Sequence, residues 1–198
     1  MGTKDAKSNP AIGFLTVIKH DQHGLFGGYL VLNTAGQPLE FHCTAPIKPN
    51  RAQEILYGPT LESFLYGEQI GRTLIDHGEH PPLVVCTDQK PVLATRDHVS
   101  MPLVLVLPSA PEKATAPLGD DPASGESGPF LRLDAAHHDG PRLATFEFGR
   151  NRLALPERAN DDRHLIVERL AGITESFDLE EPFHRIRSAI AEAQQAAR

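Results

Sequence analysis

Ten histidines make metal binding the first chemistry to consider for this chain of 198 residues. Two histidine pairs have the His-x-x-His spacing, and a fifth histidine is followed directly by a cysteine. Imidazole and thiolate groups are the protein ligands that zinc and similar transition metals prefer. The candidate ligands in the N-terminal half are His20, His23, His42, Cys43, His77 and His80.

The spacing of these ligands is nevertheless a weak metal signal. A structural zinc site usually shows closely paired cysteines and histidines in both halves, and a zinc protease shows His-Glu-x-x-His within a helix. Neither pattern occurs here. Solvated histidines explain the same residues, and His77 near a helix C-terminus would be favourable there as a cation. No cofactor is therefore predicted, and a transition metal is kept as the alternative.

The two cysteines, Cys43 and Cys86, lie in apolar strand-like runs. Either could be a nucleophile beside a histidine, with Asp88 or Asp97 orienting that base, but neither begins a helix or lies in a known signature. We expect both to be buried free thiols, and an inter-strand disulfide is the competing interpretation. Gly-x-Ser-x-Gly, Gly-x-x-x-x-Gly-Lys-Ser/Thr and Gly-x-Gly-x-x-Gly are absent. Whether the chain is an enzyme stays open.

A polar stretch between Thr44 and Thr60 is the place where a binding site is first expected. Two prolines restrict the backbone of this connection between a strand and a helix. Loops on a rigid scaffold often carry recognition groups. The alternative is a short helix over Arg51 to Tyr57 that covers one end of the sheet. The candidate binding residues are Lys48, Asn50, Arg51, Gln53, Glu54 and Tyr57.

Charge argues against nucleic acid as a partner, because the formal net charge is -7 and the pI about 5.8. Nonspecific binding to a phosphate backbone needs many Lys and Arg residues. Four C-terminal arginines, interleaved with acidic residues, predict a solvated surface; they are Arg150, Arg152, Arg158 and Arg163. A polar N-terminus and the lack of an apolar run of roughly 20 residues predict a soluble cytoplasmic protein without membrane contact.

Apolar periodicity predicts the elements of the N-terminal half. A helix from about Thr60 to His77 should be capped by Thr60, end at Gly78, and pack closely through Gly67 and Gly71. The predicted strands are Phe14 to Ile18, Leu30 to Leu32 and Leu39 to Cys43 as a hairpin, Leu83 to Cys86, Leu103 to Leu107, and a further short one over Val92 to Thr95.

A proline- and glycine-rich stretch over residues 108–129 predicts a flexible linker. It divides the chain into an N-terminal domain, 1–107, and a C-terminal unit, 130–198. In that unit Asp178 and Glu181 predict a capping box for the last helix, with Pro182 in its first turn. The predicted elements there are strands Phe130 to Leu133, Leu143 to Phe148 and Leu153 to Leu155, and helices from about Asp161 to Ala171 and through Phe183, Ile186, Ile190 and Ala193.

These elements predict an α+β fold with a mainly antiparallel sheet of hairpin or meander type and a packed helix. A smaller C-terminal hairpin with two helices should follow. Because no strong catalytic signature is present, we expect a cytoplasmic, non-catalytic interaction or regulatory protein that binds a protein partner or itself. The alternative is a metal-binding protein or metal-dependent enzyme that uses the His/Cys residues of the N-terminal domain.

Overall fold

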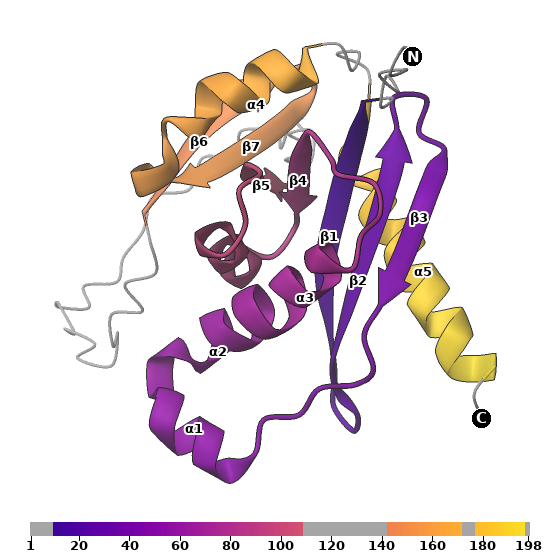
Figure 1. The fold of residues 1–198 in the computed structure, drawn as a ribbon, viewed down its shortest axis with the longest axis vertical. Coiled ribbons are helices and arrows are strands. Elements are labelled where there is room, and N and C mark those ends of the chain that lie inside the picture. Colours follow the sequence, from indigo (N-terminus) through magenta and orange to yellow (C-terminus); the bar gives the residue numbers. More distant parts are fainter. Residues whose placement is uncertain (1–9, 109–141, 172–176, 197–198) are drawn as a thin grey trace, which may run out of the picture.

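The computed structural model describes residues 10–108, 142–171 and 177–196 and is built on one seven-stranded sheet (Figure 1). The strand order is β3-β2-β1-β4-β5-β7-β6. In chain order the strands are β1 Ala11–His20, β2 Gly24–Asn33, β3 Pro38–Cys43, β4 Val84–Thr87, β5 Leu103–Leu107, β6 Leu143–Phe148 and β7 Asn151–Pro156.

Strand directions make the sheet mixed but mostly antiparallel. β1, β2 and β3 form an antiparallel meander, and β7 is antiparallel to both β5 and β6. Only β1 with β4 and β4 with β5 are parallel pairs among the described strands. The chain reaches β4 through the helical segment that follows β3, and it reaches β5 through η3. The predicted α+β fold with a mainly antiparallel sheet is therefore confirmed.

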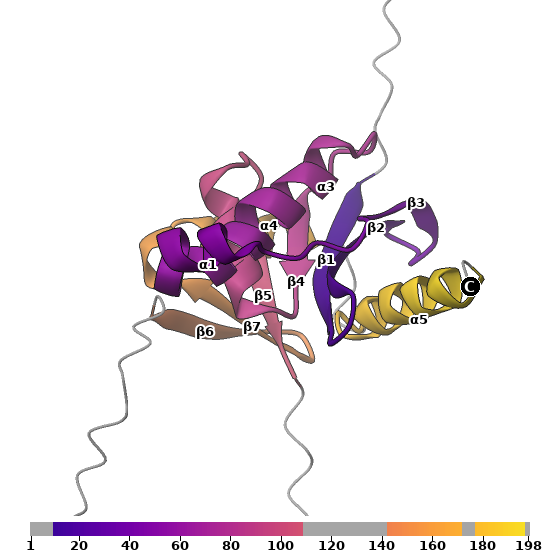
Figure 2. The same cartoon turned by 90° about the horizontal axis from the view of Figure 1, so that it is seen from below.

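Helices cover both faces of the sheet, and Figure 2 shows α3 and α5 on opposite sides of β1 and β2. One face packs against η2, α3 and η3, and the other against α4 and α5. The first helical segment consists of α1 Arg51–Tyr57, η1 Gly58–Thr60, α2 Leu61–Ser63, the π-helical η2 Phe64–Arg72 and α3 Thr73–Asp76. The remaining helices are η3 Lys90–Asp97, η4 Glu157–Ala159, α4 Asp162–Leu170 and α5 Glu181–Ala196.

Side chains of β1 point alternately to the two faces of the sheet and contribute to the apolar core on each face. Ile12 and Phe14 point toward α5, and the Phe14 ring meets the Phe183 ring edge-on at 5.7 Å. Leu15 and Val17 point to the opposite face, toward η2 and α3. Successive strand residues face opposite sides, so a strand that is apolar at nearly every position is buried on both faces.

Two adjacent glycines in β2 let both helical layers approach the sheet. A Cβ on Gly28 would overlap Cγ2 of Ile186 and lie 2.9 Å from Cδ1 of Ile190, both on α5. A Cβ on Gly27 would overlap Cγ2 of Ile70 in η2 on the other face. The glycine pair therefore sets how closely the layers pack at the centre of β2.

The predicted close packing of Gly67 and Gly71 is confirmed. A Cβ on Gly67 would lie 2.7 Å from Cβ of Ala94 in η3, and one on Gly71 would overlap Oγ1 of Thr95. The buried Thr95 hydroxyl donates to the Gly67 carbonyl at 3.1 Å. Because Gly67 and Gly71 have no side chains, η3 can pack directly against η2.

Three predictions for the N-terminal half are wrong. Val92 to Thr95 belong to the 3-10 helix η3, which begins with Pro91 near its N-terminus, rather than to a strand. Thr60 does not cap a helix, because its backbone is already helical and its hydroxyl donates to the Tyr57 carbonyl. Cys43 is exposed on the edge strand β3, although Cys86 is buried and both thiols are free, as expected.

The C-terminal hairpin joins the same sheet, because Leu105 of β5 pairs with Ala154 of β7. The expected strands over 143–148 and 153–155 and both expected helices are present, and Pro182 lies in the first turn of α5. The strand predicted over 130–133 and residues 109–129 of the predicted linker lie outside the described residues. The domain bounds 1–107 and 130–198 stay a prediction. Within the described part, no helix is long and apolar enough to cross a membrane.

Replacing Gly28 with Ala should lower the free energy of unfolding by about 1–3 kcal/mol, because the new methyl group overpacks the contact with α5. Chemical denaturation measures this change. In an Ile186→Ala background the cost of Gly28→Ala should be smaller, since the obstructing Cγ2 is gone. Equal costs in the two backgrounds would show that Gly28 does not set this contact.

Candidate functional site

The carboxyl ends of the parallel strands β4 and β5 lie side by side, because Thr87 pairs with Leu105. β1 passes beside them and continues to His20, since Thr87 also lies opposite Leu15 in the middle of β1. Sheets with parallel strands often bind ligands outside the carboxyl ends of these strands. This position is the first place to look for a small-molecule site.

Three polar side chains meet there. The hydroxyl of Thr16, fully buried on β1, donates to Oδ1 of Asp88 at 2.6 Å. Arg187 of α5 donates to Oδ2 of the same carboxylate. The Asp88 side chain is 17% exposed and that of Arg187 is 39% exposed, so the carboxylate is the more enclosed partner.

A cavity of about 250 Å³ opens beside this carboxylate, and we call it the strand-end cleft. Ligand sites combine an apolar wall with a few convergent polar groups, and this cleft has both. Its lining residues are Asp88, Gln89, Val106, Pro108, Glu180, Phe183, His184 and Arg187. From the sequence, Asp88 was a candidate metal ligand beside Cys86 and a candidate partner for a catalytic cysteine, but not part of this site. Its place directly after an apolar strand was a signal for this site.

The predicted binding residues of the 44–60 connection mostly hold that segment in place. Asn50 caps α1 in a reciprocal capping box with Gln53. Arg51 pairs with Glu54 at 3.1 Å on the exposed surface. Tyr57 stacks on Phe64 with ring centroids 4.1 Å apart, which ties the end of α1 to η2. Lys48 donates to the carbonyl of Gln22 in the β1–β2 turn.

The notable feature of α1 is a pair of exposed apolar side chains. Ile55 is 67% exposed and Leu56 81% exposed, and α1 buries none of its own residues. Figure 1 shows α1 at the outer end of the helical segment, away from the sheet. The prediction of a helix over Arg51 to Tyr57 is confirmed, but α1 stands clear of the sheet instead of covering its end. Sequence reasoning missed both aliphatic residues because it searched the segment for polar groups.

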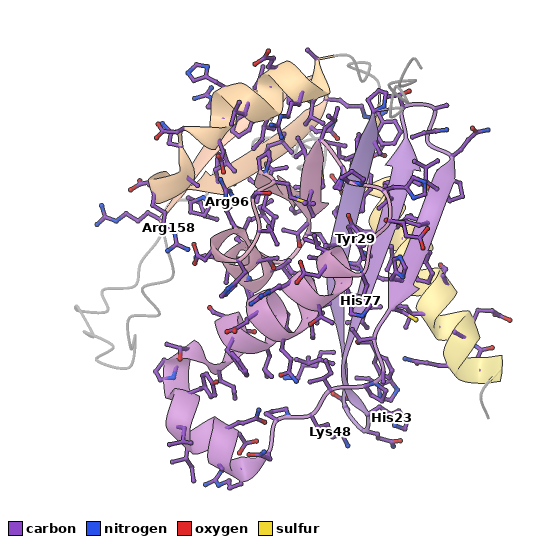
Figure 3. The ribbon with its side chains drawn as sticks, viewed as in Figure 1. His23, Tyr29, Lys48, His77, Arg96 and Arg158 are labelled. Carbon is purple, nitrogen blue, oxygen red and sulfur yellow. The ribbon has the colours of Figure 1, made fainter. Side chains whose placement is uncertain are left out.

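Four of the six candidate metal ligands occupy three separate places, and Figure 3 shows His23 and His77 apart from each other. The rings of His20 and His23 are 4.6 Å apart at the β1–β2 turn. His77 forms a hydrogen bond through Nδ1 with the Thr73 carbonyl at the end of α3. Cys43 is exposed on β3. Over residues 10–108, 142–171 and 177–196 no group of three or more His, Cys, Asp or Glu residues could hold a metal ion.

The other two candidates, His42 and His80, meet at the carboxylate of Glu40. Oε2 of Glu40 lies 3.2 Å from Nδ1 of His80 and 3.6 Å from Nε2 of His42. The same oxygen accepts the backbone N–H of Glu79 at 2.8 Å. Burial raises the pKa of the Glu40 carboxyl, but the N–H groups of Glu79 and His80 and the His80 imidazole outweigh it and lower the pKa. The cluster ties β3 to the loop before β4.

A second cleft, between η3 and α4, is crossed by two ion pairs. Arg96 binds Asp162 through two N–H groups at 2.7 and 3.2 Å, and Arg158 donates to Asp97 at 2.7 Å. The Asp162 pairing raises the pKa of Arg96. Figure 3 shows both arginines at the same end of the molecule. These pairs join η4 and α4 to η3, so we assign them a structural role.

No family model and no curated protein sequence matches the chain. Among solved structures, the crystal structure of human ENDOV aligns with 51% of this chain at 14% sequence identity and a TM-score of 0.28. The alignment spans 46% of that protein's chain. Likeness at this level carries no argument about the fold or function of this chain.

Replacing Glu40 with Gln should lower the free energy of unfolding by about 1–3 kcal/mol near neutral pH, because the variant loses charge-assisted hydrogen bonds. The lowered folded-state pKa means that the carboxylate stabilises the fold above the unfolded pKa of about 4.3. That contribution is lost as the pH falls through the folded-state value. Urea unfolding between about pH 7 and pH 3 should therefore show the difference from wild type shrinking with acid.

Glu79→Gln is the matched control, since Glu79 contributes its backbone N–H rather than its side chain to the cluster. It should leave the pH dependence of wild type unchanged. A difference between Glu40→Gln and wild type that stayed constant with pH would contradict the assigned ionisation of Glu40.

Proposed function

We propose that this chain is a non-catalytic interaction or regulatory protein whose helix α1 docks in an apolar groove of a partner protein. The observation that carries the proposal is the exposure of Ile55 and Leu56, at 67% and 81%, on a helix without buried residues of its own. Single exposed aliphatic side chains are common on protein surfaces. Two adjacent ones on a capped, projecting helix favour a binding role.

The helix is pre-organised for binding. The capping box of Asn50 and Gln53 fixes its start, and the stacking of Tyr57 on Phe64 fixes its end. A partner would therefore bind a helix that is already formed, with a small cost of ordering. Burying each of the two aliphatic side chains contributes roughly 1.5–3 kcal/mol before the costs of association. Such a pair is sufficient to be the central contact of an interface.

The size of α1 favours a grooved partner over pairing of two flat surfaces. A seven-residue helix offers far less than the roughly 800 Å² per partner of a standard interface. A groove surrounds an inserted helix on several sides and so buries more area for each residue. Arg51 and Glu54 flank the aliphatic pair with one charge of each sign, which gives no preference for a strongly charged partner.

The state of the thiols supports a non-catalytic role. Burial raises the pKa of the Cys86 thiol to about 12, so this group stays protonated and unreactive at neutral pH. Cys43 lies exposed on an edge strand. Cys86 therefore lacks the lowered pKa by which nucleophilic cysteines are recognised.

Replacing Ile55 and Leu56 with Ser should weaken partner binding and leave folding intact, because both side chains are mostly exposed to water. Quantitative affinity capture compares the double variant with wild type, and the captured protein is then purified and titrated. We expect its affinity to fall by about tenfold or more, since each lost hot-spot contact costs 1–2 kcal/mol or above. Circular dichroism and thermal unfolding should match wild type within error.

The matched control is Leu165→Ser with Val167→Ser, which removes two aliphatic side chains of α4 that are 42% and 39% exposed. This variant should keep the partner's affinity. A partner retained equally by the Ile55/Leu56 variant would contradict the proposal. So would a wild-type chain that stays a monomer in native mass spectrometry at all concentrations and binds no protein.

A further inference from the structure

We infer that two copies of this chain associate through β3, whose open edges pair antiparallel and join the two sheets into one. The inference does not rest on the role proposed for α1, which lies at another part of the molecule (Figure 1). It stands on the outward backbone groups of β3, on the apolar side chains beside them and on the register that these residues favour.

In the described part of the chain, the outer edge of β3 offers backbone groups that no other strand binds. β3 is the last strand of the sheet, and its only neighbour among the described strands is β2. The Thr44 N–H, just beyond β3, donates to the Gly27 carbonyl at 3.0 Å. Hydrogen-bonded and non-hydrogen-bonded pairs alternate along an antiparallel ladder, so Phe41 and Cys43 direct their N–H and C=O groups away from β2. These groups are a template for a further strand.

The side chains at this edge favour association over contact with water. Leu39 is 36% exposed and Phe41 39% exposed, and Cys43 is exposed as well. Phe41 lies opposite Leu30 of β2, which belongs to the apolar core under α5. A second strand beside β3 would therefore extend this core past the present edge of the sheet.

β3 has little of the protection that usually keeps an edge strand single. Natural edge strands often carry a lysine or another charged group that prevents pairing. β3 has no lysine, and its one acid, Glu40, is 9% exposed and bound by the loop before β4. Pro38 and the bulge opposite Leu32 disturb only the first residues of the strand.

One antiparallel register suits the residues of β3. With a two-fold axis at Phe41, the outward backbone groups of the two Phe41 residues face each other. Leu39 then lies opposite Cys43 of the second copy, and Glu40 lies opposite His42 of the second copy, so apolar groups meet and an acid meets a base. An axis at Glu40 would place two carboxylates opposite each other, and an axis at His42 would place two imidazoles opposite each other and shorten the overlap.

The end of α5 enlarges this contact. Figures 1 and 2 show that the C-terminal end of α5 extends past β3. Ala189, Ala191 and Ala193 are exposed there. A two-fold axis perpendicular to the sheet places both α5 ends on the same face of the joined sheet, where small side chains allow close approach. Two short strands alone bury less than the roughly 800 Å² per partner of a standard interface, and the α5 ends supply part of the remainder.

Sedimentation equilibrium of the full chain tests the inference. The wild type should be a dimer that dissociates on dilution. Phe41→Lys should raise the dissociation constant at least about tenfold, because it places two ammonium groups side by side at the axis. Leu165→Lys is the matched control, since Leu165 is 42% exposed and lies on α4 rather than at the edge of the sheet. It should dimerise as wild type does.

Disulfide trapping with copper phenanthroline as the oxidant reads the register. Leu39→Cys places a thiol opposite Cys43 of the second copy, within reach of a disulfide, and should give covalent dimers. Wild type is the control, because its two Cys43 residues would lie four positions, about 13 Å, apart along the paired strands and should stay unlinked.

A wild-type chain that stays monomeric at the highest concentration reached would overturn the inference and leave the edge of β3 to another segment or another protein. A dimer that Phe41→Lys leaves intact, or wild-type dimers linked through Cys43, would contradict the proposed pairing. Should Phe41→Lys fail to fold, the trapping result decides alone, because the absence of covalent dimers in Leu39→Cys contradicts the association of β3 edges.

Discussion

The close approach of two helical layers to β2, which Gly27 and Gly28 permit, is the constraint on which the rest of the structure depends. With α5 seated against Gly28 through Ile186, the next residue along the helix reaches the carboxyl end of β4. Arg187 can then bind Asp88, and the strand-end cleft forms between α5 and the sheet. A side chain at position 28 would lift α5, and the Asp88 ion pair and the cleft would change together.

The same architecture separates two surfaces with different chemistry. The strand-end cleft is polar, small and built on buried strands, as sites for small ligands usually are. Helix α1 is apolar, projecting and held at both ends by local contacts, as is typical of a helix that binds in a groove. The two lie on opposite faces of the sheet, so a partner at α1 leaves the cleft accessible.

Apolar periodicity and turn-forming residues predicted most strands and helices, because most of these elements have a strong local sequence pattern. Leu39 to Cys43, Leu143 to Phe148 and the helix around Phe183 were found at nearly their true positions. Val92 to Thr95 were placed in a strand because an apolar run of four residues is equally typical of a buried 3-10 helix. The cap was assigned to Thr60, whereas the capping box of this helical segment lies at Asn50, which was considered only as a binding residue.

The sites were harder to predict, because they depend on which segments meet in space. Thr16, Asp88 and Arg187 lie far apart in the sequence and come together only through the strand order. His42 and His80 were both among the six candidate ligands, but Glu40, the carboxylate between them, was not. Cys43 was expected to be buried because the alternation of apolar and polar residues predicts which face of the sheet a side chain occupies. The same alternation does not show that β3 is an edge strand.

The most direct test of the account is hydrogen–deuterium exchange of the full chain with and without its purified protein partner. The account predicts that the partner slows exchange at residues 51–57 and leaves the strands of the sheet unchanged. Protection confined to other segments, with α1 exchanging as freely as before, would contradict the central claim that α1 is the binding element.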